Sequence, residues 1–93
     1  MTEASTTEPV TLTDEDRVRM QRLFEEVVGR LQAMSLIMNR LGATDSSRAK
    51  AGLRVKLNVT PGSMTGRLCV TDVYGCGCYD YDQGVCEPCG PGD

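Results

Sequence analysis

The clearest pattern in the chain is a row of apolar residues at helical spacing between residues 14 and 41. The steps alternate between four and three residues, which is the heptad spacing of a helix that packs along one seam. Thr13 precedes three acidic residues and supplies a capping hydroxyl, and Gly42 is a natural stop. We therefore expect one amphipathic helix within residues 13–42. Its seam consists of Met20, Phe24, Val27, Leu31, Met34, Met38 and Leu41.

Beyond the helix, the period of the pattern changes from helical to extended. Residues 53–59 alternate strictly between apolar and polar, which is typical of a strand with one buried face. Turn-forming residues follow, and residues 67–74 are expected to form a second strand with Leu68, Val70 and Tyr74 on one face. Because a lone hairpin is marginal in water, we expect this β-hairpin, residues 53–74, to lie on the helix. Residues 43–52 read as a polar linker.

The two ends of the chain lack such patterns. Residues 1–12 are rich in Thr, Glu and Ser and predict a disordered acidic arm. Residues 75–93 consist mostly of Gly, Pro, Asp and Cys, with Val85 as the single aliphatic residue, and predict an irregular tail that only sulfur chemistry can order. The predicted fold class is thus a small α+β protein: one long amphipathic N-terminal helix plus a β-hairpin, followed by a Cys/Gly-rich irregular tail.

Composition narrows the range of functions. The chain has 93 residues, no His and no Trp. The absence of His excludes Ser–His, Cys–His and His–metal sites within the chain, and we expect no enzymatic activity. Domains of this size often need a disulfide, a metal or a partner subunit for stability.

The charge is unevenly distributed, with nine basic and three acidic residues between positions 17 and 56 and a net charge of −3 overall. We interpret the basic region as a solvated helix face and expect no nucleic-acid partner, because domains that bind nucleic acid usually carry net positive charge. The N-terminal residues do not match a signal peptide, and no run of about 20 apolar residues is present. We expect a cytoplasmic protein without a membrane partner.

Five cysteines carry the candidate chemistry. Four of them form a Cys-x-Cys pair and a Cys-x-x-Cys pair, and four thiolates suit one tetrahedral zinc ion. The candidate zinc ligands are Cys76, Cys78, Cys86 and Cys89, with Cys69 as the spare. The alternative is disulfide bonding or enzymatic modification among all five, Cys69, Cys76, Cys78, Cys86 and Cys89, and their odd number leaves at least one thiol free or paired between chains.

Three functional hypotheses follow. The first is a small interaction or assembly protein, because the seam is longer than the rest of the chain can easily cover, so that the helix needs a second copy or another protein. The second rests on organisation: a cysteine-free, helix-bearing front and a short Cys-rich end resemble the precursors of ribosomally made, post-translationally modified peptides. That resemblance implies a leader of about residues 1–66 and a core of about residues 69–93. The third is a minor structural subunit of a virus or phage particle.

Overall fold

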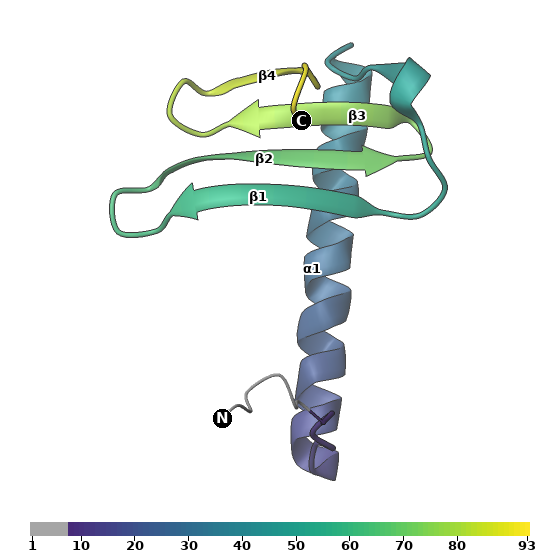
Figure 1. The fold of residues 1–93 in the computed structure, drawn as a ribbon, viewed down its shortest axis with the longest axis vertical. Helices are drawn as coiled ribbons and strands as arrows, with labels where there is room; N and C mark the ends of the chain where they lie inside the picture. Colours follow the sequence, from purple (N-terminus) through teal and green to yellow (C-terminus); the bar gives the residue numbers. More distant parts are fainter. Residues whose placement is uncertain (1–7) are drawn as a thin grey trace, which may run out of the picture.

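The computed structural model describes residues 8–93 as one long helix lying across a four-stranded antiparallel sheet (Figure 1). The helix α1 spans Asp14–Arg40. A short 3-10 helix, η1 (Ser46–Arg48), leads into the sheet. The predicted α+β class is confirmed. The strands are β1 (Arg54–Thr60), β2 (Thr65–Asp72), β3 (Gly75–Asp80) and β4 (Val85–Pro88).

Local sequence signals set both ends of α1. The Thr13 hydroxyl accepts a hydrogen bond from the backbone N–H of Asp16 at 3.2 Å, and three acidic residues occupy the positive end of the helix dipole. At the other end Gly42 adopts a φ of 76°, a left-handed conformation that glycine takes without strain. Of the expected acidic arm, residues 1–7 lie outside the described residues and residues 8–12 have no regular structure.

The C-terminal segment is more ordered than the expected irregular tail. Residues 75–93 contain β3 and β4, so that the expected hairpin is the first half of a meander with the order β1-β2-β3-β4. The physical reason is the alternation of Gly and Cys at the start of this segment. It places Cys76 and Cys78 on one face of β3 and leaves Gly77 on the other, where the helix passes close by.

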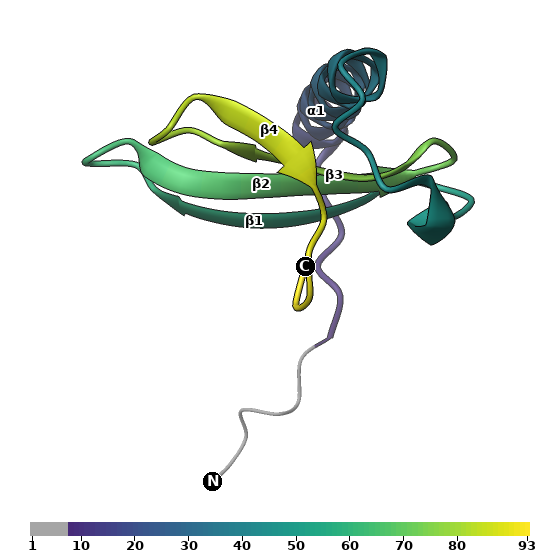
Figure 2. The ribbon, with the colours of Figure 1, turned by 90° about the horizontal axis from the view of Figure 1, so that it is seen from above.

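The two faces of the sheet differ in chemistry. Residues that pair directly across neighbouring strands share a face, and successive residues point to opposite faces. The pairing of Val70 with Gly77 therefore belongs to the face that α1 covers, and the pairing of Cys69 with Cys78 belongs to the other face. Figure 2 shows α1 on one side of the sheet only. We call the opposite side the sulfur face; it carries Cys69, Thr71, Cys76, Cys78 and Cys89.

The core is small and lies where α1 crosses β2 and β3. Met38 is 2% exposed and Val70 is 1% exposed, and Ala43 completes the buried cluster. Leu31 and Met34 pack against this cluster and are half-buried. The seam of the helix therefore contacts the sheet only through its C-terminal half, because the sheet is too narrow to cover the whole helix.

Several predicted core positions are instead exposed. Strand β1 forms where the alternation predicts it, but the expected buried face is wrong: all residues of β1 are exposed, including Val55, Leu57 and Val59. The reason is that α1 packs mainly on β2 and β3 and β1 is an edge strand. Tyr74, expected within the second strand, lies in the turn after β2 and is exposed. Among residues 8–93 no helix is both long and apolar enough to cross a membrane.

One buried polar contact fixes the helix to the sheet. The Ser35 hydroxyl of α1 donates a hydrogen bond to Oδ2 of Asp72 at the end of β2, and both residues are buried. The other carboxylate oxygen, Oδ1, accepts the backbone N–H of Tyr74 at 2.9 Å. The same carboxylate thus closes the β2–β3 turn and orients the helix above it.

Candidate functional site: a sulfur cluster on one face of the sheet

The sheet register brings four of the five cysteines together. Cys69 of β2 lies directly opposite Cys78 of β3, and Cys76 lies two residues from Cys78 on the same face. Cys89 follows β4, and its backbone N–H donates to the Cys76 carbonyl at 3.1 Å. The cluster therefore draws one residue from β2, two from β3 and one from the segment after β4.

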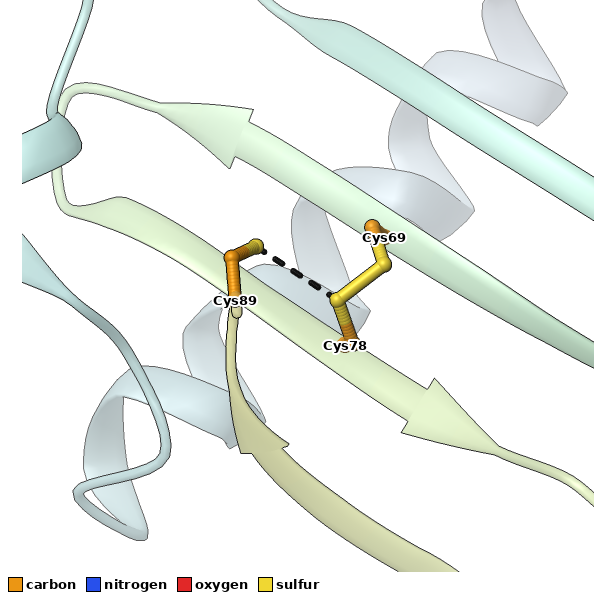
Figure 3. Close-up of side chains that lie close together, drawn as sticks. All are labelled: Cys69, Cys78 and Cys89. Atoms are coloured by element: carbon orange, nitrogen blue, oxygen red, sulfur yellow. Dashed lines mark hydrogen bonds between the residues drawn. A yellow bond between two sulfur atoms is a disulfide. The ribbon is translucent and has the colours of Figure 1, made fainter. Parts of the chain in front are cut away.

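The four sulfurs form two disulfides that touch each other. Cys69 is bonded to Cys78, and Cys76 is bonded to Cys89. The Sγ atoms of Cys78 and Cys89, which belong to different disulfides, are 3.4 Å apart (Figure 3). The sulfurs of Cys69, Cys78 and Cys89 all lie within 4.8 Å of one another. One compact group of sulfur atoms thus occupies the centre of this face.

Two chain segments cover the cluster. Asp45, just before η1, exchanges backbone hydrogen bonds with Cys76: the Asp45 N–H donates at 2.9 Å and its carbonyl accepts at 3.1 Å. The Arg48 side chain donates to the Gly90 carbonyl at 3.0 Å and so joins η1 to the C-terminal segment. As a result, the cysteines of the cluster are almost completely buried, and Cys78 has no exposed surface at all.

Basic side chains surround the cluster. Arg67 of β2 pairs with Glu87 at 2.7 Å and with Asp93 at 3.0 Å, which fastens the last residues of the chain over the sulfur face. The hydrogen bond from Arg67, helped by the backbone N–H of Gly90, holds the pKa of Asp93 below its usual value. A cavity of about 440 Å³ beside the cluster is lined by Cys69, Thr71, Asp93 and four basic residues, Arg48, Lys50, Arg54 and Lys56.

Cys86 lies apart from the other four cysteines. It pairs with Tyr79 across β3 and β4 and packs on the helix side of the sheet, where it is half-buried and in no disulfide. It lines a cavity of about 200 Å³ together with Met34, Ile37, Met38 and Tyr79. Of the predicted zinc ligands the structure brings Cys76, Cys78 and Cys89 together and leaves Cys86 out, while the expected spare, Cys69, belongs to the cluster.

The predicted and observed cysteine sets differ because the β2–β3 register decides which cysteines share a face of the sheet. The spacing of the cysteines alone does not reveal this register. Asp72 pairs with Gly75, so only Val73 and Tyr74 form the β2–β3 turn, and this short turn sets Cys69 opposite Cys78. Two residues of the sequence could have predicted this short turn. Asp72 caps the turn with its side chain, and Gly75 adopts a φ of 125° just after it.

The helix seam is the second candidate site, and the structure divides it. Its C-terminal half packs on the sheet, as described above. In its N-terminal half Met20 is 55% exposed, Phe24 is 69% exposed and Val27 is 53% exposed, and Leu41 at the end of the seam is exposed as well. Figure 1 shows the N-terminal half of α1 extending past β1, away from the sheet. We call Met20, Phe24 and Val27 the exposed seam.

Comparison of the chain with protein-family models, with curated proteins and with solved structures gives no match in any of the three.

Proposed function

We propose that the chain is a small, non-catalytic assembly protein that pairs with a second copy of itself through the exposed seam. The observation that carries this proposal is that one continuous heptad pattern is half packed and half open. Leu31 and Met34 pack against the core, whereas Phe24, about two turns before Leu31, is 69% exposed. In this proposal the disulfide-bonded sheet holds the C-terminal half of the helix in place and leaves the N-terminal half available for pairing.

The exposed seam has the character of a contact surface. Exposed apolar residues scattered singly are ordinary, but contiguous ones on a projecting element mark interaction sites. Met20, Phe24 and Val27 follow one another at four- and three-residue steps on a helix that extends beyond the sheet, and Leu23 beside them is also exposed. A second helix is the partner that heptad spacing selects.

The sequence of α1 favours a second copy in antiparallel orientation. If Met20 lies opposite Phe24 of the second copy, heptad geometry sets Leu23 against Leu23 of that copy. The positions that flank the seam then bring Asp16 opposite Arg30 of the second copy, and this ion pair forms twice. Charges at such flanking positions set the orientation of paired helices. In this register Met20 and Phe24 of the two copies meet each other and the flanking charges are complementary, whereas Val27 lies opposite Arg17 of the second copy.

Sedimentation equilibrium on the full chain tests the pairing. Phe24→Ser should raise the dimer dissociation constant roughly 100-fold or more, because two buried rings are lost per dimer. The matched control is Val18→Ser, which also removes an exposed apolar side chain of α1 but off the seam, and it should change the constant little. A chain that stays monomeric at every concentration, or equal effects of the two variants, would refute the proposal.

A charge exchange tests the orientation. Asp16→Arg should weaken the dimer by placing two like charges together, and the double variant Asp16→Arg/Arg30→Asp should restore it. Failure of the second change to rescue the first would argue against the antiparallel register while leaving the Phe24 result standing.

The two other hypotheses receive less support from the fold. A division between leader and core near residues 66–69 would cut β2, whose pairing with β1 and β3 runs through this region. No contact among residues 8–93 favours a virus particle in particular. Intact mass of the protein from its own host separates the cases, because a clipped species that keeps only the C-terminal segment would favour the precursor hypothesis.

A further inference from the structure

We propose that Cys69, Cys76, Cys78 and Cys89 form a zinc site when their two disulfides are reduced, so that the sulfur cluster exchanges between a cross-linked and a metal-bound state. This site differs from the one suggested by the cysteine spacing, since it contains Cys69 and excludes Cys86. The zinc site does not depend on pairing of the helices, so its test is separate from the test of the proposed function.

The spacing of the sulfurs supports a shared ion. A tetrahedral zinc–thiolate site with Zn–S bonds of about 2.3 Å requires its sulfurs to be about 3.8 Å apart. The Sγ atoms of Cys78 and Cys89 are 3.4 Å apart although no bond joins them, and the Cys69 sulfur lies within 4.8 Å of both. The fourth sulfur, that of Cys76, is bonded to the Cys89 sulfur. The Cys76 sulfur is not in the group of three that lie within 4.8 Å of one another, so after reduction its side chain has to rotate toward the other three to complete the site.

Backbone hydrogen bonds, which a reductant does not itself cleave, add to the disulfides in holding the chain around the cluster. Cys69 and Cys78 lie in paired strands, and Cys89 donates its backbone N–H to the Cys76 carbonyl. Asp45 holds the other edge of Cys76 through two backbone hydrogen bonds. The cysteines are therefore positioned by the sheet as well as by the disulfides. The resulting site is closed to solvent, which is typical of structural rather than catalytic zinc.

The charges on the sulfur face suit a zinc–thiolate group, which carries two negative charges. Lys56 lies directly opposite Cys69 in the β1–β2 register, and Arg48 and Arg67 hold the covering segment. The acidic groups nearby, Glu87 and Asp93, are already paired with Arg67. In addition, the Thr71 hydroxyl lies 3.0 Å from the Cys76 sulfur and donates to it, an outer contact of the kind that orients metal ligands.

The exchange balances in atoms and electrons. Two equivalents of a dithiol reductant deliver four electrons and four protons, reduce both disulfides to four thiols and leave as two cyclic disulfides. One Zn²⁺ then replaces the thiol protons, which pass to the buffer. In the reverse direction two equivalents of a hydroperoxide accept four electrons with four protons, become alcohol and water, and leave two disulfides and free Zn²⁺.

Alkylation mapping of the wild-type chain is the first test. The full chain is reduced with a phosphine, given Zn²⁺ alone, and treated briefly with iodoacetamide before its peptides are mapped. We expect one zinc per chain by native mass spectrometry, protection of Cys69, Cys76, Cys78 and Cys89, and modification of Cys86. Protection of Cys86 with modification of Cys69 would overturn the proposal in favour of the spacing-based ligand set, and failure to bind zinc would overturn both sets.

Matched variants sharpen the result. Cys86→Ser should keep one zinc per chain and the spectrum of a Co²⁺ tetrathiolate. Cys69→Ser should lose that spectrum, and the wild-type map decides the matter if this variant does not fold. Thr71→Val should weaken zinc binding roughly 10- to 100-fold.

Hydroperoxide added to the zinc form should release the metal while both disulfides return; release with oxidation of Cys86 alone would contradict the exchange.

Discussion

Ser35 and Asp72 form a buried polar contact between α1 and the end of β2, and removing its donor is the most direct test of how the helix is docked. Ser35→Ala leaves one oxygen of a buried carboxylate without its hydrogen bond, so we expect the free energy of unfolding to fall by about 1–3 kcal/mol. Urea unfolding with the disulfides intact measures this. Ser63→Ala, in the exposed β1–β2 turn, is the control and should cost almost nothing; equal costs would mean that the Ser35 contact does not hold the helix.

Asp93 gives the molecule a specific response to acid. Its pKa is lowered first by the hydrogen bond from Arg67 and then by the N–H of Gly90, so its stabilising contribution is present above the unfolded value of 3.8 and is lost as the pH falls through the lower folded value. Because the pair is partly exposed, we expect Asp93→Asn to cost at most about 1 kcal/mol at neutral pH. Urea unfolding between about pH 6 and pH 2 should show the two proteins converging in acid. A constant difference across that range would refute this assignment.

At the scale of elements, Gly77 decides how closely the helix approaches the sheet. A Cβ added there would lie 2.7 Å from the carbonyl oxygen of Ala43 and 3.2 Å from the sulfur of Met38. Gly77→Ala should therefore push the end of α1 outward and cost about 1–3 kcal/mol. Gly29→Ala is the matched control, since no atom lies within 4 Å of its added Cβ, and it should stabilise the helix by up to about 1 kcal/mol. Thermal unfolding of both variants shows whether each substitution stabilises or destabilises the fold. A stabilising Gly77→Ala would contradict the packing described.

The same elements show what the sequence could and could not predict. The helix was predictable because its seam and Thr13 cap are local signals, and the β1 alternation was predictable for the same reason. Strand β3 was not, since Gly-Cys-Gly-Cys resembles loop composition until the cysteines are counted as small apolar residues on one face. The membership of Cys69 in the cluster depends on the β2–β3 register, which two unremarkable turn residues set. The exposure of Phe24 depends on the width of the sheet, a property of the whole fold.

The whole molecule combines a small apolar core on one side of the sheet with a sulfur cluster on the other. Apolar packing involves Met38, Val70 and a few half-buried neighbours, whereas β4 contributes only Val85, which is exposed, and the half-buried Cys86. The order of β3 and β4 must therefore depend strongly on the disulfides, which close loops with sequence separations of 9 and 13 residues. A closed loop of this length restricts the unfolded chain and stabilises the fold by about 3 kcal/mol.

Reduction without metal is the corresponding test. In a phosphine with a chelator, we expect the free energy of unfolding in urea to fall by about 2–5 kcal/mol, because the loop-closure term is lost. Hydrogen exchange should show β3 and β4 losing protection, while the middle of α1 keeps its own local protection longer. Adding Zn²⁺ in excess of the chelator should restore much of the lost stability, since binding to the folded state alone shifts the equilibrium toward it. If reduction leaves the urea midpoint unchanged, the small apolar core suffices to hold the sheet, and the cysteines serve chemistry rather than stability.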